Sequence, residues 1–270
     1  MSAREGAGRA WSFLRRDLLI EASYRFNLLL SLLSVFLAAA VFHFLGKIVD
    51  PSVVRGAGPD YFSFAIVGIA FSSFLRTGLF SFSNALREEQ MMGTLEAMLA
   101  TPVSGAEVVL YGSLWRFAFA TITAASYLAV GALFFGLSLG RADWPAALLL
   151  LLLTLLSYCS LGILAACFIM VFKRGDPVNW LVGNLSTLLA GVYYPLEVMP
   201  GWLQALGKVI PLTWSLRGLR RALLEGCGVG ELGTEIAALA GISAVLLPLS
   251  LALFALALRH AKRTGSLVKY

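Results

Sequence analysis

The chain has 270 residues and a net charge of +6; 59% of its residues are hydrophobic, only 13% are charged, and its mean hydropathy is +0.83. This composition excludes an ordinary soluble domain and predicts an all-α polytopic membrane protein. The basic residues flank apolar runs, so they favour anionic lipid over nucleic acid as the surface they meet. Three cysteines without a CxxC spacing or a nearby histidine predict neither a metal site nor a disulfide framework.

The first two elements are an interfacial helix and a membrane span. Residues 9–25 place Trp11 and other apolar residues on one side and arginines towards the other, which predicts an amphipathic helix along the membrane surface. A short soluble helix is the alternative. The apolar run over residues 26–46 matches the ~20 helical residues that cross a bilayer. A turn-rich loop then leads to a second span over residues 61–83.

Arg76 lies inside the second apolar run. A charge at that depth is costly unless it reaches the interface or meets an opposite charge. We therefore expect Arg76 either to extend to the inner interface or to form an ion pair with Glu88 or Glu89. Arg87 is a second candidate for such an ion pair.

Three more spans follow. The run over residues 108–139 is longer than a bilayer requires, so the helix is either tilted or projects its first turns into water. Asp143 is placed to cap a fourth span over residues 144–172. The fifth run, residues 178–194, is barely long enough to cross, so another element must complete that layer.

The apolar pattern of residues 195–230 predicts two short amphipathic helices. The final span follows over residues 236–258. The pair either lies on the membrane or dips into it as a re-entrant hairpin. In the second helix a stripe of leucines lies opposite Arg217, Arg220 and Arg221. The aromatic residues near the start of the segment are either part of an interfacial belt or a candidate outer gate: Tyr193, Tyr194 and Trp202.

Six transmembrane helices place both termini on the same side of the membrane. The segments on that side hold more of the 21 Lys and Arg residues than the opposite loops, which predicts cytoplasmic termini. Residues 84–104 are then a cytoplasmic loop between the second and third spans. We expect a single multi-pass domain over residues 1–270 in a bacterial or archaeal cytoplasmic membrane.

The loop carries a helical apolar pattern of its own. Leu95, Met98 and Leu99, together with either Met91 or Met92, fall on one face of a helix too short to span. Methionine side chains adapt to irregular grooves, so the face is suited to dock on a partner protein. The alternative is that the face packs on neighbouring helices of the same chain.

The sequence from Glu89 to Ser104, EQMMGTLEAMLATPVS, resembles the Glu-x-x-x-Gly-Thr-Leu-Glu and Thr-Pro-Val-Ser motif of ABC-2 type transporter permeases. The stretch YPLEVMPGW, from Tyr194 to Trp202, is similar to the segment after the fifth span of that family. The chain departs from the family at Met91 and Met92, where members often carry alternating acidic and basic residues. That departure favours an apolar contact over ion pairing.

The resemblance implies a coupling helix that docks in a cleft of a separate ATP-binding subunit. It also implies an exporter of two permeases, here expected as a homodimer, with two ATP-binding subunits that hold ATP and magnesium. The cargo of such exporters is amphipathic: a drug, a lipid or a lipid-linked glycan. The residues assigned to partner binding are Glu88, Glu89, Met92, Gly93, Thr94, Leu95, Glu96, Met98, Leu99, Thr101 and Pro102.

Absent motifs indicate that this chain is not an enzyme. It has no GxxxxGK[ST] loop to hold ATP phosphates, so energy must come from another chain. It has no HExxH or GxSxG, which excludes common protease and hydrolase sites. Two other classes stay open at this point: an ion-coupled secondary transporter, which requires intramembrane carboxylates, and a membrane scaffold that transports nothing.

Overall fold

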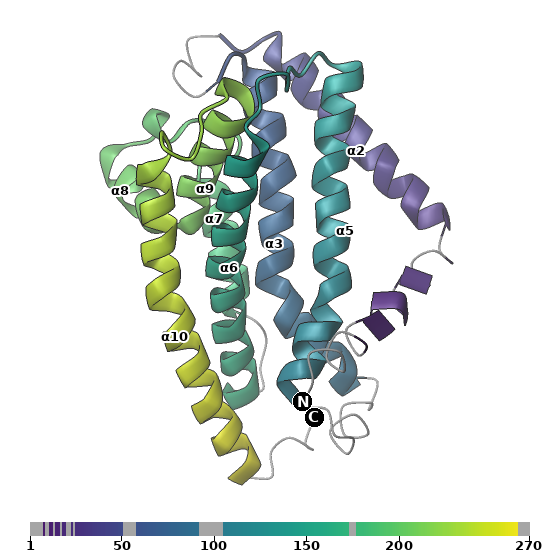
Figure 1. Cartoon of the computed structure of the whole chain (residues 1–270), viewed down its shortest axis with the longest axis vertical. Coiled ribbons are helices and arrows are strands. Elements are labelled where there is room, and N and C mark those ends of the chain that lie inside the picture. The colour runs from purple at the N-terminus through teal and green to yellow at the C-terminus, as the bar shows by residue number, and fades with distance from the viewer. Residues whose placement is uncertain are drawn as a thin grey trace.

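The computed structural model describes residues 25–50, 58–91, 105–172 and 177–263, together with isolated positions between residues 8 and 23. These residues form helices and short connections, with no strand among them (Figure 1). The all-α class predicted from composition is therefore confirmed.

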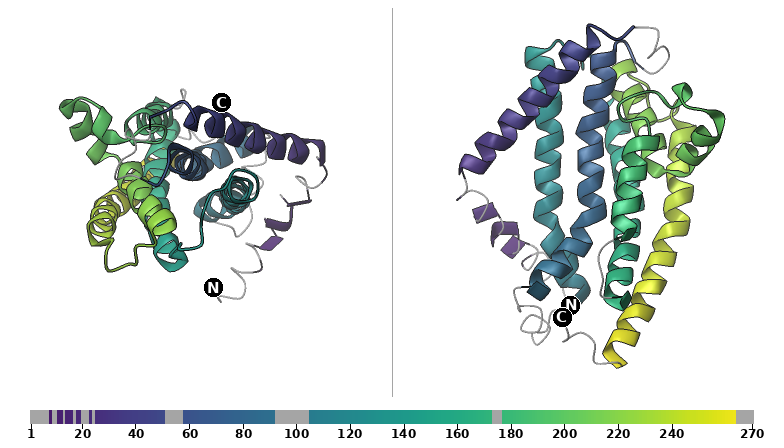
Figure 2. Two further views of the ribbon diagram at one scale, coloured as in Figure 1. Left: turned by 90° about the horizontal axis from the view of Figure 1, so that it is seen from above. Right: turned by 180° about the vertical axis from the view of Figure 1, so that it is seen from behind.

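Five helices of the described ranges are long and apolar enough to cross a membrane. Four of them run side by side, and the first leans away from the bundle (Figures 1 and 2). Such a bundle satisfies every backbone group within its own helices, as hydrocarbon requires. The five are α2 (Arg25–Gly46), α3 (Tyr61–Met91), α5 (Gly105–Phe134), α6 (Trp144–Phe172) and α10 (Gly233–Arg263).

The helix boundaries show where local sequence signals acted. Helix α6 has the bounds predicted for it, and the Ala146 amide donates to Asp143 Oδ1 at 2.8 Å, which confirms the cap. Helix α3 continues past residue 83 to Met91, because the polar residues there are good helix formers without glycine or proline. Helix α10 extends beyond residues 236–258 at both ends, from Gly233 to Arg263.

Helix α5 ends before the apolar run does. The predicted span reached residue 139, but the helix ends at Phe134. Gly136 takes a φ of 78°, and the Leu137 amide donates to the Gly131 carbonyl at 3.0 Å. A glycine with positive φ and this backward hydrogen bond form a common helix terminus, so the remaining apolar residues lie in a connection.

The predicted span over residues 178–194 is not one of the five long helices. Helix α7 (Pro177–Leu189) has 13 residues, or about 20 Å of rise, which is shorter than the ~30 Å of hydrocarbon. It ends where Gly191 takes a φ of 74° in a turn before Pro195. The count of six membrane-spanning helices is therefore not confirmed.

A hairpin of short helices completes the layer that α7 leaves open. It consists of η2 (Leu196–Val198), α8 (Gly201–Val209), α9 (Pro211–Arg220) and the π-helical turn η3 (Arg221–Glu225). Helix α9 is almost wholly buried and contacts α3, α6 and α10. It occupies the space beside the spans in Figure 1.

The contacts of α9 with α6 show that the hairpin enters the bundle. The Asp143 amide, before α6 begins, donates to the Ala222 carbonyl at 2.9 Å. Deeper in α6, the Thr154 hydroxyl donates to Ser215 Oγ at 2.8 Å. Thr154 is ten residues into α6, or about 15 Å along it, so α9 runs antiparallel to α6 from deep in the bundle outwards. Of the two alternatives for residues 195–230, these contacts support the re-entrant hairpin.

The two ends of the bundle are distinct. Helices α3 and α5 meet residues 92–104 at one end, called the proximal end, where α6 and α10 also finish (Figure 1). The opposite, distal end holds the starts of α3, α6 and α10 and the turn after η3. Buried hydroxyl contacts tie the helices between these ends, such as Tyr158 Oη donating to Ser186 Oγ at 3.1 Å. Such contacts join helices where lipid removes the hydrophobic drive for association.

Candidate functional site

The predicted docking residues lie mostly outside the described part of the chain. Met92, Gly93, Thr94, Leu95, Glu96, Met98, Leu99, Thr101 and Pro102 belong to residues 92–104, so their roles stay predictions. Arg87, Glu88 and Glu89 belong to the last turns of α3, just before that segment. The described helices α3 and α5 therefore flank the segment directly on both sides.

The continuous helix α3 bears on the ion pair expected for Arg76. Twelve residues separate Arg76 from Glu88, which amounts to about 18 Å of helical rise. The side chains of residues 82–91 lie outside the described part of the chain, so the ion pair of Arg76 with Glu88 or Glu89 stays a prediction. The Arg76 side chain is exposed and lines a cleft on the side of the bundle.

This cleft, of about 730 Å³, lies between α3, α5 and the end of α7. We call it the lateral cleft. Two arginines line it, Arg76 on α3 and Arg116 near the start of the α5 span. Its other lining residues are hydroxyl-bearing, aromatic or small apolar: Ile69, Ser72, Ser73, Thr77, Phe80, Ser81, Trp115, Phe119, Ala120, Thr123, Thr187 and Tyr193.

The hydroxyls of α3 make a polar stripe that an apolar span can tolerate. Ser73, Thr77 and Ser81 follow each other at intervals of four residues. Thr77 donates to the Ser73 carbonyl at 3.2 Å and Ser81 to the Thr77 carbonyl at 2.6 Å. Each hydroxyl thus meets its hydrogen-bonding need inside its own helix. The stripe faces the lateral cleft and leaves hydroxyl oxygens available as acceptors.

The charged residues in the described lining of the lateral cleft are both arginines. Arg76 and Arg116 line it, and none of the lining residues that the structure describes is acidic. Charges attract each other far more strongly in a low-dielectric surrounding than in water. The cleft is therefore suited to an anionic group whose other parts are apolar.

The three candidate gate residues lie in different places. Tyr193 lines the lateral cleft; its ring stacks on Phe42 at 5.8 Å between centroids, and its carbonyl accepts from Tyr61 Oη at 3.1 Å. Tyr194 donates to the Leu188 carbonyl at 2.8 Å, and Trp202 is exposed on α8. Of the three, only Tyr193 lies where it can close the cleft, and its gating role stays a prediction.

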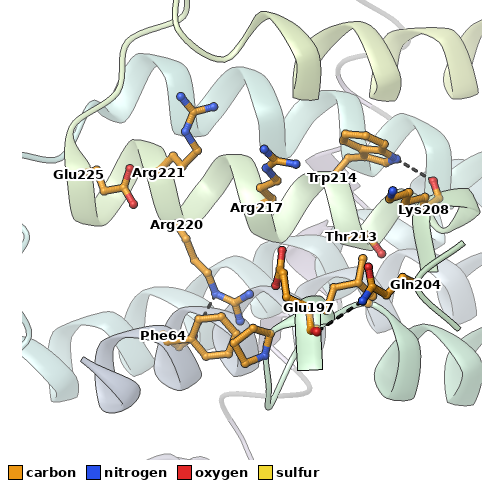
Figure 3. Close-up of a pocket in the computed structure, with 14 residues that line it drawn as sticks. Phe64, Glu197, Gln204, Lys208, Thr213, Trp214, Arg217, Arg220, Arg221 and Glu225 are labelled. Carbon is orange, nitrogen blue, oxygen red and sulfur yellow. Dashed lines mark hydrogen bonds between the residues drawn. The ribbon is translucent and has the colours of Figure 1, made fainter. Parts of the chain in front are cut away.

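Arg220 is a buried cation that the sequence did not reveal. Its guanidinium lies over the Phe64 ring, 3.4 Å from the centroid (Figure 3). Nε donates to the Phe64 carbonyl and Nη2 to the Val192 carbonyl, both at 3.1 Å. Arg220 is buried, so the two carbonyls and the ring face take the place of water around its charge. This one side chain joins α9 to α3 and to the turn after α7.

Gly68 makes this junction sterically feasible. A Cβ built at Gly68 would collide with the Val192 carbonyl oxygen and would lie 2.6 Å from Arg220 Nη2. Only glycine therefore allows the turn after α7 and the arginine to approach α3 so closely. The sequence shows that Gly68 lies in a span. It does not show why glycine is required there, because Val192 and Arg220, which approach it, lie more than 100 residues further along the chain.

Glu235 holds the start of α10 to the hairpin. Its side chain is fully buried, and Oε1 accepts from Arg221 Nη1 at 3.0 Å and lies 3.2 Å from Arg217 Nε. The sequence placed Arg217, Arg220 and Arg221 together on one polar face. The structure separates them: two pair with Glu235, and Arg220 turns into the core.

Comparison with known proteins agrees with these features of a helical membrane protein. Residues 10–224 match the model of the family described as ABC-2 type transporter. The chain is similar to Nodulation protein J of Rhizobium meliloti (strain 1021), with 26% identity over 226 residues, which are 77% of this chain and 84% of that protein. It is also similar to Nodulation protein J of Sinorhizobium fredii (strain NBRC 101917 / NGR234), with 24% identity over 209 residues, 71% of this chain and 78% of that protein.

A shorter similarity links the chain to the Linearmycin resistance permease protein LnrN of Bacillus subtilis (strain 168). The two are 26% identical over 130 residues, which are 43% of this chain and 32% of that protein. The family match is much longer and spans residues from the N-terminal segment to η3. The chain therefore belongs to the ABC-2 type transporter family and is a multi-pass transport permease.

Proposed function

We propose that this permease is the membrane-spanning subunit of an ATP-driven exporter that moves an amphipathic cargo outward. The observation that carries the proposal is the lateral cleft, whose described lining holds two arginines and a stripe of hydroxyls but no carboxylate. The cleft offers polar contacts to a headgroup along one wall and is bordered by apolar helix surface. An amphipathic molecule meets both requirements.

The acidic residues of the spans disfavour coupling to an ion gradient. Glu235 is the one Asp or Glu within the five candidate spans of the described ranges. Arg217 and Arg221 hold it at the distal end of α10, away from the lateral cleft. Ion-coupled carriers use intramembrane carboxylates to bind and release the driving ion. The energy is therefore expected from separate ATP-binding subunits, which members of this family normally have as partners.

The position of residues 92–104 gives a direct route from such a subunit to the cargo. Helix α3 enters this segment and α5 leaves it, and the same two helices form the walls of the lateral cleft. When ATP-binding subunits close and push on residues 92–104, the displacement passes along two rigid helices to the walls of the cleft. Two permeases, as a homodimer, and two ATP-binding subunits complete the proposed exporter.

The cargo class follows from the same cleft. Arg116 lies towards the proximal end of α5 and Arg76 lies at the middle of α3, so a cargo headgroup entering from that leaflet meets Arg116 before Arg76. The relative LnrN is named a permease for resistance to linearmycin, and export of an antibiotic is one form of the proposed activity. A lipid or a lipid-linked glycan fits the cleft equally.

Docking is tested by the double variant Leu95→Asp/Leu99→Asp. Two carboxylates on the predicted apolar face should weaken association with the ATP-binding subunit by about tenfold or more, since buried anchors dominate such interfaces. Cargo should then no longer stimulate ATP hydrolysis. Co-purification and ATPase assays in nanodiscs measure both quantities.

The matched control is Leu95→Met/Leu99→Met, which keeps the face apolar and should retain both association and stimulation. Full association and full transport by the double aspartate variant would contradict docking through this face.

A further inference from the structure

A second cavity, of about 380 Å³, lies between α8, α9, η2 and the turn after α7. We call it the hairpin cavity. Figure 3 shows Trp214 and Arg217 of α9 in a row with Arg221 at the start of η3, and Lys208 beyond the tryptophan. Arg220 and the carboxylates of Glu197 and Glu225 complete its charged lining.

The cations of the hairpin cavity outnumber its carboxylates. Four cationic side chains line it, against Glu197, Glu225 and the buried Glu235 that pairs with two of the arginines. Among the ion pairs of the described residues, none includes Arg220 or Lys208. The cavity therefore carries an excess of one positive charge, which a monoanion neutralises.

The depth of the cavity fits the headgroup region of a membrane. Helix α6 has 29 residues, or about 43 Å of rise, close to the ~40–45 Å of a bilayer with its headgroups. Gly218 of α9 packs against Leu150, which is six residues or about 9 Å into α6. The neighbouring Arg217 side chain is 61% exposed at that depth. An exposed guanidinium just below the helix ends is favourable where lipid phosphates lie.

An apolar groove adjoins the cavity on the other side of the hairpin. It has a volume of about 650 Å³ and is lined by α6, α7, α8 and α10. Helix α8 faces both sites: Gln204 and Lys208 line the cavity, whereas Leu206 and Val209 line the groove. A charged cavity and an apolar groove on one short helix match a molecule with an anionic head and hydrocarbon chains.

From these contacts we propose that the hairpin cavity binds the monoanionic phosphodiester headgroup of a phospholipid in the distal leaflet. Lys208 and Arg217 hold the phosphate, and the acyl chains lie in the groove. Glu197 is the resident carboxylate that competes with the phosphate for these cations. Inorganic phosphate shares the headgroup chemistry but not the chains. The site does not depend on the proposed export activity.

The test is native mass spectrometry of the full chain released from nanodiscs of phosphatidylglycerol or of phosphatidylcholine. Phosphatidylglycerol should remain bound at least tenfold more often than phosphatidylcholine. The variant Lys208→Gln/Arg217→Gln should lose this preference about tenfold. The control Lys47→Gln/Arg141→Gln removes the same charge from exposed residues that do not line the cavity and should keep it. Glu197→Gln should strengthen retention severalfold, because it removes the competing carboxylate.

Three outcomes would overturn the proposal. One is equal retention of the two lipids, and another is unchanged retention by the Lys208→Gln/Arg217→Gln variant. The third is displacement of the lipid by millimolar inorganic phosphate, which would make this a site for free anions. If the double variant fails to fold, the single variant Lys208→Gln replaces it in the same retention measurement. It should fold, because the exposed Lys208 side chain makes no ion pair among the described residues.

Discussion

Valine at Gly68 should lower the free energy of unfolding by about 3 kcal/mol or more. The new side chain would displace the Val192 carbonyl and the Arg220 guanidinium from α3. Overpacking alone costs ~1–3 kcal/mol, and a buried charge that loses its partners adds several more. Denaturant titration in detergent, followed by tryptophan fluorescence, measures the change.

Gly241→Val is the matched control for this prediction. Gly241 also lies within a long apolar helix, but a Cβ there meets no atom within 4 Å. The control should change the free energy of unfolding by no more than about 1 kcal/mol. Equal stability of the Gly68 and Gly241 variants would show that the turn after α7 does not need its close approach to α3.

Reversing the charge of Arg76 should reduce transport about 100-fold. The arginine is exposed in the lateral cleft, so glutamate there replaces attraction of an anionic headgroup by repulsion. Hydrogen bonds to a charged group contribute ~1.5–3 kcal/mol, and each 1.4 kcal/mol is a factor of ten. Association with the ATP-binding subunit should not change, because Arg76 lies about 18 Å from Glu88 along α3. Cargo uptake into inverted vesicles measures the effect.

Arg141→Glu provides the control for charge reversal. Arg141 is exposed in the connection before α6 and does not line the lateral cleft, so its variant should transport at the normal rate. Normal transport by Arg76→Glu would show that the cargo headgroup does not pass along this cleft.

The fold was predictable where the deciding signals are local. Hydropathy located the long helices, and Asp143 fixed the start of α6 through one hydrogen bond three residues away. Hydropathy overestimated α5 and α7, because both end before their apolar residues do, and Gly136 and Gly191 follow with positive φ. A glycine inside an apolar run signals such an end only when its backbone conformation is known.

The site was predictable only in part because its contacts are distant in sequence. Arg220 Nε and the Phe64 carbonyl are 156 residues apart, and no periodicity links them. The polar stripe at Ser73, Thr77 and Ser81 was detectable as hydroxyls at intervals of one helical turn, but its neighbours across the cleft come from α5 and α7. The docking role of residues 92–104 still depends on the motif, since this segment lies outside the described residues.

Reconstitution decides most directly whether ATP drives this permease. The purified chain is placed in liposomes with and without its ATP-binding subunit, and movement of a labelled anionic amphiphile is followed under ATP or under an ion gradient. We expect movement only when ATP and both subunits are present, and none under an ion gradient alone. Robust movement by this chain alone under an ion gradient would contradict an ATP-driven exporter.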